Sequence, residues 1–104
     1  VIILPINLVF SGSLNLKMSI TAIGNSMINA YIGNGAILVV DRSIEPQHKC
    51  IVVAAISGAY ACKRLLVRPR LCLASENPKY PPILIGKNEE LEIAGVVIAA
   101  INTY

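Results

Sequence analysis

Short β-prone runs, each closed by a turn signal, constrain the fold of this chain more than any other feature of its sequence. Apolar residues alternate with polar ones or form continuous runs of a strand's length, and no stretch keeps a helical period. Glycine, proline and asparagine, which favour turns, separate these runs. The pattern predicts strands at residues 16–23, 36–40, 50–56, 59–67, 71–74 and 91–101.

The connections between these runs support a mainly β fold, a single compact domain of short twisted strands. Residues 33–35 form a strong turn signal, and Ser57-Gly58 indicates a hairpin between two of the strands. Three prolines make residues 76–82 an extended loop, and Gly95 marks a bulge or bend in the last strand. A length of 104 residues fits one domain, with no internal repeat.

The first fifteen residues differ from the rest of the chain. Residues 1–15 mix apolar groups with proline, serine and glycine, so we expect an N-terminal arm, or an irregular first strand followed by a loop. Residues 16–104 form the predicted domain itself. The chain begins with valine instead of methionine, which indicates a fragment or a processed product.

Composition and cysteine spacing exclude several classes of protein. Hydrophobic residues make up 55% of the chain, which is incompatible with a disordered segment. The longest apolar run, residues 93–101, is too short to span a bilayer, which needs about 20 residues, so no membrane partner is expected. Cys50, Cys62 and Cys72 are odd in number and widely spaced, and His48 and Cys50 have no second ligand pair. We therefore expect free thiols in the reducing cytoplasm, with no metal and no cofactor.

The charge distribution does not favour a nucleic-acid-binding protein. The formal net charge is only +3, whereas such domains usually carry a strong, clustered basic charge. Residues 63–70 form a basic run, but no aromatic side chains are interleaved with it for bases to stack on. This run is interpreted as a solvated strand edge.

The tetrapeptide Gly24-Asn25-Ser26-Met27 lies where a predicted strand ends and a turn or short helix begins. Gly24 permits a tight backbone there because it has no Cβ atom. Ser26 has two interpretations: it caps the following helical turn, or its hydroxyl is a nucleophile held clear of the sheet beside backbone N–H groups.

Lys63 is a candidate base for such a serine. A serine hydroxyl is a weak nucleophile until a base takes its proton, and a lysine can be that base only when it is neutral, as burial favours. On a strand, Lys63 shares its face with apolar Ala61 and Leu65. Arg64 also has apolar same-face neighbours, but an arginine does not deprotonate in proteins. His48, the sole histidine, leaves a Ser-His-Asp arrangement open.

The chain resembles the self-cleaving domain of the LexA/UmuD family of SOS-response proteins, and within it the UmuD-like branch. The resemblance covers nearly all of residues 18–101. It is carried by residues 24–27, 35–41, 48–54, 62–65, 68–69, 77–83 and 91–98.

This resemblance implies a LexA/UmuD C-terminal peptidase-like fold and a serine peptidase without a cofactor. Ser26 matches the family nucleophile and Lys63 the family base, while the backbone N–H groups of Asn25 and Ser26 are candidates for the oxyanion hole. The family forms homodimers and cuts its own N-terminal arm when a RecA filament on single-stranded DNA promotes the reaction. The UmuD-like branch also implies a UmuC-like Y-family polymerase subunit as partner in translesion synthesis, with no direct sequence-specific DNA binding.

Several positions depart from the family pattern. Asn25 stands where aspartate is usual, and the Gly-Asp pairs expected at 35–36 and 49–50 are missing, so contacts to RecA or the polymerase are expected to differ. The scissile Cys-Gly or Ala-Gly bond is absent from residues 1–22, and the sole Ala-Gly, at 94–95, lies inside a predicted strand. These features predict the processed form.

Two alternatives remain open from the sequence. The chain is also compatible with the C-terminal dimerisation and self-cleavage domain of a LexA-like or phage repressor, which a helix-turn-helix region upstream of Val1 would indicate. In a third interpretation it is a plain β domain in which Ser26 and Lys63 have no chemical role.

Overall fold

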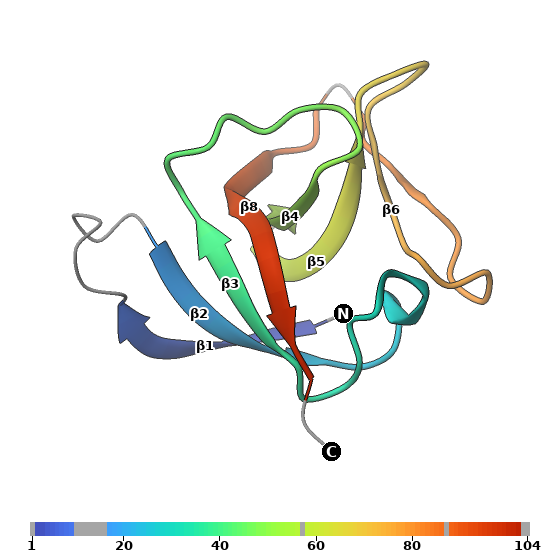
Figure 1. Cartoon of the computed structure of the whole chain (residues 1–104). Coiled ribbons are helices and arrows are strands. Elements are labelled where there is room, and N and C mark those ends of the chain that lie inside the picture. Colours follow the sequence, from blue (N-terminus) through green and yellow to red (C-terminus); the bar gives the residue numbers. More distant parts are fainter. Residues whose placement is uncertain (1, 10–16, 57, 87, 103–104) are drawn as a thin grey trace.

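The computed structural model describes residues 2–9, 17–56, 58–86 and 88–102, and the regular secondary structure within them is almost entirely β-strand (Figure 1). A single short 3₁₀ helix, η1, occurs among these residues. The mainly β prediction is therefore confirmed. The elements are β1 (Ile2–Val9), β2 (Lys17–Ile23), η1 (Ile28–Ala30), β3 (Ile37–Asp41), β4 (Ile51–Ile56), β5 (Ala59–Leu66), β6 (Cys72–Ala74), β7 (Ile83–Leu84) and β8 (Leu91–Ile101).

The strands form one antiparallel sheet that curls on itself. The strand order is β1-β2-β3-β8-β4-β5-β6-β7, and an additional pairing of Ile2 with Ala61 connects β1 to β5. Six strands thus form a ring, and β6 and β7 extend from β5 on one side (Figure 1). This curvature brings the end of β2 toward β5, two segments that are far apart in the sequence.

The N-terminal segment contributes a strand to the ring. Within the expected arm, β1 pairs antiparallel with β2, and its register shifts between Pro5 and Leu8. Proline has no backbone N–H to donate to a strand partner, which accounts for an irregularity near Pro5. The loop expected after this strand lies outside the described residues, and the division into residues 1–15 and 16–104 stays a prediction.

The last strand occupies an unexpected position. Residues 91–101 were predicted to be a strand, which is confirmed, and β8 lies between β3 and β4 in the strand order. Its first half pairs with β4 as far as Val96, and its second half pairs with β3 from Val96 onward. The register against β4 shifts beside Gly95, where a Cβ atom would come within 2.5 Å of a Val40 methyl group. The bulge predicted at this glycine is therefore present.

The two faces of the curled sheet bury two apolar clusters. The larger cluster surrounds Met27, Leu38 and Val40, and the smaller surrounds Val52 and Leu73. The described residues contain no helix that is long and apolar enough to cross a membrane. All three cysteines are free; Cys62 and Cys72 are buried and Cys50 is half-buried.

Candidate functional site

The Ser26 corner, defined as residues 24–27, follows β2 directly. Gly24 has a φ of +97°, a conformation that favours glycine, and its N–H donates to Asn34 Oδ1 at 2.8 Å. The N-cap of η1 is Met27, and no side chain caps this helix. Ser26 therefore does not cap the helix, as one interpretation of the sequence required, and its side chain is 97% buried.

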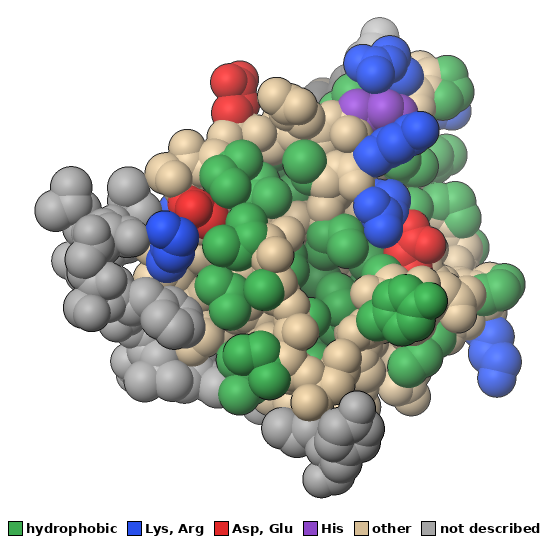
Figure 2. Space-filling model, viewed as in Figure 1, with side chains coloured by type: hydrophobic (Ala, Val, Ile, Leu, Met, Phe, Trp, Pro, Cys, Tyr) green, Lys and Arg blue, Asp and Glu red, His purple; other side chains and the backbone are tan. Residues whose placement is uncertain are grey.

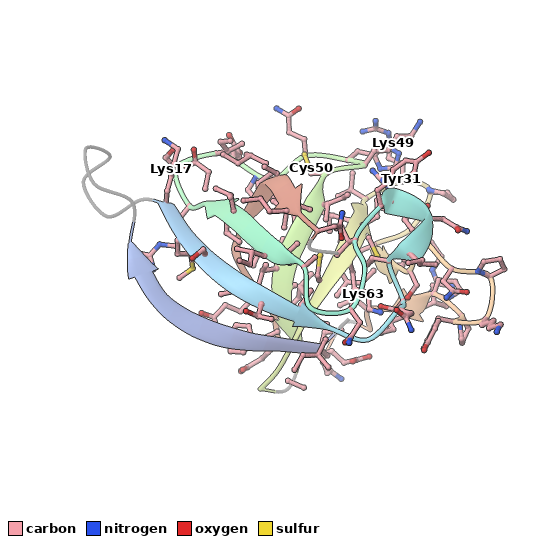
Figure 3. All side chains as sticks on the ribbon, turned by 60° about the horizontal axis from the view of Figure 1, so that its bottom comes forward. Lys17, Tyr31, Lys49, Cys50 and Lys63 are labelled. Carbon is pink, nitrogen blue, oxygen red and sulfur yellow. The ribbon has the colours of Figure 1, made fainter. Side chains whose placement is uncertain are left out.

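Lys63 reaches Ser26 from β5. Its Nζ donates to Ser26 Oγ at 3.0 Å, although 37 positions separate the two residues. Only 7% of Lys63 is exposed, and its direct partner across β4 is the fully buried Val52. Figure 3 shows Lys63 well away from Lys17, which lies at the start of β2. A buried amine within hydrogen-bonding distance of a serine is the arrangement that a Ser–Lys nucleophile requires.

Arg64 faces the other way. Its guanidinium forms an ion pair with Glu76 and donates to the Lys49 carbonyl oxygen at 2.6 Å. Periodicity could not decide which of the two neighbouring basic residues turns inward, and the structure places Lys63 inward and Arg64 outward.

Ser75 is a further residue of the site that sequence reasoning missed. Lys63 Nζ donates to Ser75 Oγ at 2.8 Å, and the Tyr80 ring centre lies 5.8 Å from the same nitrogen. A signal was available, because β5 and β6 pair Arg64 with Ala74 and Leu65 with Leu73. Extending this antiparallel register by one residue brings Ser75 opposite Lys63.

Residues 75–77, which we name the clamp segment, connect the two halves of the site. The Glu76 carbonyl oxygen accepts from the N–H of Asn29 at 2.8 Å, and the Glu76 N–H lies 3.3 Å from the Met27 sulfur. Asn77 Nδ2 donates to the Asn25 carbonyl oxygen at 2.9 Å. The segment that presents Ser75 to Lys63 therefore also holds the Ser26 corner.

The carbonyl of Asn25 has a second partner. It accepts from the N–H of Ile28 at 3.2 Å as well as from Asn77. Because a trans peptide unit is planar, fixing this carbonyl directs the N–H of Ser26 to the opposite side. The suggested oxyanion role of the Asn25 and Ser26 N–H groups stays a prediction.

His48 lies in a different environment. Its Nδ1 accepts from the Val67 N–H at 3.0 Å, and burial together with the nearby Arg68 and Lys49 lowers the pKa of its imidazole. In Figure 2 the histidine, coloured purple, lies at the surface among Lys and Arg side chains. The structure therefore brings Lys63 to Ser26 and engages His48 with the end of β5.

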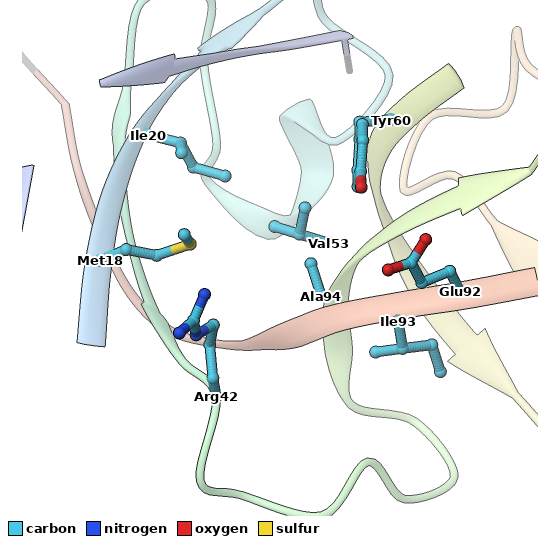
Figure 4. Close-up of a pocket in the computed structure, with 8 residues that line it drawn as sticks. All are labelled: Met18, Ile20, Arg42, Val53, Tyr60, Glu92, Ile93 and Ala94. Atoms are coloured by element: carbon cyan, nitrogen blue, oxygen red, sulfur yellow. The ribbon is translucent and has the colours of Figure 1, made fainter. Parts of the chain in front are cut away.

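A separate hollow is lined by residues other than those of the Ser26 site. It measures about 580 Å³ and has an apolar lining with Arg42 and Glu92 at its margin (Figure 4). Neither Ser26 nor Lys63 is among its described lining residues. In the part of the chain that the structure describes, no group of His, Cys, Asp or Glu side chains is arranged to hold a metal ion.

A family model described as peptidase S24-like matches residues 10–98, a range that contains Ser26, Lys63 and the clamp segment. The chain belongs to the peptidase S24-like family. It is 48% identical to the protein MucA of Salmonella typhimurium over 75 residues, which are 71% of this chain and 51% of MucA.

Two further relatives are also similar to the chain. It is 40% identical to the protein SamA of Salmonella typhimurium over 83 residues, 80% of this chain and 57% of SamA. It is 35% identical to the LexA repressor of Bordetella avium over 82 residues, 78% of this chain and 38% of the repressor. The chain thus spans about half the length, or less, of the curated relatives it matches.

Proposed function

We propose that this chain is a UmuD-like subunit of an error-prone translesion polymerase in the SOS response, and that it carries a Ser26–Lys63 dyad for self-cleavage. The observation that supports this most strongly is the 3.0 Å hydrogen bond between the buried Lys63 amine and the Ser26 hydroxyl. The match to MucA and SamA supports the UmuD-like branch.

In the proposed reaction, neutral Lys63 takes the proton of Ser26 Oγ as that oxygen attacks the carbonyl carbon of a peptide bond. The N–H groups of Asn25 and Ser26 would stabilise the oxyanion that forms. Lys63 then gives its proton to the leaving amine as the C–N bond breaks. Water hydrolyses the acyl-Ser26 ester, with Lys63 again accepting a proton.

The substrate in this proposal is an N-terminal arm of the same kind of protein, cut when a RecA filament on single-stranded DNA promotes the reaction. After cutting, the domain would act with a UmuC-like Y-family polymerase subunit. The second candidate is the C-terminal domain of a LexA-like repressor, favoured by the match to the Bordetella avium protein. A helix-turn-helix region encoded upstream of Val1 would decide for the repressor.

We also propose a two-fold homodimer. Ile98 and Ile101 are about half exposed on the second half of β8, for which β3 is the strand partner among the described residues. Exposed apolar groups beside an open strand edge favour pairing with a second copy. Sedimentation at micromolar concentration is expected to give a dimer, and Ile98→Lys is expected to shift it toward monomer. A monomer in the unsubstituted chain would refute the dimer.

A fluorophosphonate probe tests the nucleophile on the chain as it stands. In the labelling reaction the oxygen of an activated serine attacks the phosphorus of the probe and forms a P–O bond. Fluoride leaves, and the serine proton passes to the base. Ser26 is expected to be labelled, as located by peptide mass spectrometry, and Ser26→Ala is expected to abolish labelling. Ser43→Ala is the matched control, because this exposed serine bonds only locally, to Asp41.

The peptidase reaction requires an arm. Chains extended upstream of Val1 with a family-type Ala-Gly segment are expected to cut themselves, and the Ser26→Ala chain is expected to stay whole on a gel. Cutting by the Ser26→Ala chain would disprove the proposed nucleophile.

A further inference from the structure

Lys63 holds two hydroxyl groups at once. Its Nζ lies 3.0 Å from Ser26 Oγ and 2.8 Å from Ser75 Oγ. A neutral lysine amine has two N–H bonds and one lone pair, and it takes a proton only along the lone pair. Rotation about the terminal C–N bond alone would leave the lone pair free to point away from Ser26. Whatever fixes this rotation therefore determines how often the base faces its proton.

We propose that Ser75 is a positioning residue for Lys63. In the neutral amine, Ser75 Oγ accepts one N–H, which keeps the lone pair away from Ser75 and available to the Ser26 hydroxyl, which then donates to Nζ. This inference rests on the proposed function, because it assigns a role within the Ser26–Lys63 reaction. Ser75 touches neither the peptide bond nor the oxyanion, and acts through Lys63.

Contacts of the neighbouring residues fix the position of Ser75 opposite Lys63. It follows β6 directly, in the register position opposite Lys63. The next residue, Glu76, is tied to Arg64 on β5 and accepts from the Asn29 N–H at 2.8 Å. Asn77 then holds the Asn25 carbonyl. Because the same three residues contact β5 and the Ser26 corner, the distances from Lys63 to both hydroxyls are set together.

Removal of the Ser75 hydroxyl has two expected effects. The amine would lose its fixed rotation, so the plateau rate of cleavage is expected to fall about 10- to 100-fold, the scale of a misplaced catalytic group. A hydroxyl oxygen that accepts from an amine also stabilises the charged form of that amine. Its loss is therefore expected to move the midpoint of the pH–rate profile to lower pH. A purely structural role would slow the reaction without moving the midpoint.

The experiment compares Ser75→Ala and Ser75→Thr in the arm-extended chain. Cleavage is followed from pH 6 to pH 11, about the range over which lysine side chains titrate in proteins, and thermal unfolding is recorded for each variant. Ser75→Thr keeps the hydroxyl and is expected to retain most of the rate and the original midpoint. Should Ser75→Ala not fold, Ser75→Cys, whose sulfur is a weak acceptor, replaces it. Ser43→Ala serves as the control for loss of a serine hydroxyl outside the site.

The outcomes separate this inference from the function on which it rests. If Ser26→Ala or Lys63→Ala still cuts, the dyad itself is wrong. If both abolish cutting while Ser75→Ala matches the unsubstituted chain in rate and midpoint, the dyad stands and the positioning role is overturned. A slow Ser75→Ala with an unmoved midpoint also overturns it.

Discussion

Lys63, beside the Ser26 corner, and His48, in the turn at residues 46–49 that we name the His48 turn, are both capable of proton transfer. They differ in what surrounds them. Lys63 is buried against apolar side chains and is held by two hydroxyls. His48 is half-buried at the surface, with a backbone N–H as its bonded partner and two cations nearby. Under the proposed mechanism, this difference in burial and in bonded partner is what selects Lys63 over His48 as the base.

The largest effect expected from this comparison is on the cleavage rate. In the arm-extended chain, Lys63→Ala is expected to slow cutting about 10²- to 10⁴-fold, the usual contribution of a general base. Lys63→Arg should not restore it, because a guanidinium keeps its proton. His48→Ala should leave the rate almost unchanged, as measured by gel densitometry. If His48→Ala slowed cutting and Lys63→Ala did not, the assignment of Lys63 as the base would be wrong.

A second comparison uses the thiols of the two regions. Burial raises the pKa of the Cys62 thiol from 9.0 to about 11, whereas Cys50, next to the His48 turn, is half-buried. Iodoacetamide at pH 8 is therefore expected to modify Cys50 first and Cys62 only on unfolding, as read by mass spectrometry. Rapid modification of Cys62 in the folded chain would contradict the buried environment beside Lys63.

The same thiol makes stability depend on pH. An unfolded chain releases the Cys62 proton above about pH 9, while the folded chain keeps it up to about pH 11. Protonated Cys62 therefore contributes stability below pH 9, and this contribution is lost as the pH rises toward 11. The loss is about 2–3 kcal/mol for a shift of this size. Denaturant titrations should show that the free energy of unfolding declines between pH 9 and pH 11, and that this decline is smaller in Cys62→Ala.

The smallest effect concerns His48 itself. Its lowered pKa predicts an NMR titration midpoint below 6.5, the ordinary value for histidine. Because the folded pKa is depressed, any contribution of neutral His48 to stability is present above pH 6.5 and is lost as the pH falls through the folded pKa. The hydrogen bond from the Val67 N–H to Nδ1 requires the neutral ring. A midpoint above 6.5 would indicate an acidic neighbour and would weaken the contrast with Lys63.

Local pattern was sufficient to predict most strands. The predicted run 91–101 matches β8 in full, and 16–23, 50–56 and 59–67 differ from β2, β4 and β5 by one residue each. Such runs are recognisable because alternation and turn residues act within a few positions of one another. The order of strands in the sheet is decided by long-range pairing, so the interior position of β8 was not predictable from its own residues.

The residues of the candidate site also differ in whether local sequence could predict them. Ser26 and Lys63 could be proposed from a motif and from the chemistry of their side chains. In the folded chain Arg64 pairs with Glu76, a contact between β5 and the clamp segment that the local sequence does not reveal. Ser75 was missed because its contact with Lys63 depends on the β5–β6 register, which local sequence does not reveal.

The clamp segment also has a consequence for protein synthesis. The ribosome makes Ser26 first and Lys63 later, and residues 75–77 follow only after the turn beyond β5. A nascent chain that ends before residue 75 thus contains Ser26 and Lys63 but lacks the contacts of Ser75 with Lys63 and of Asn77 with Asn25. If the proposed self-cleavage occurs, a ribosome-bound chain that ends before residue 77 is expected not to cut, and the released full chain is expected to cut.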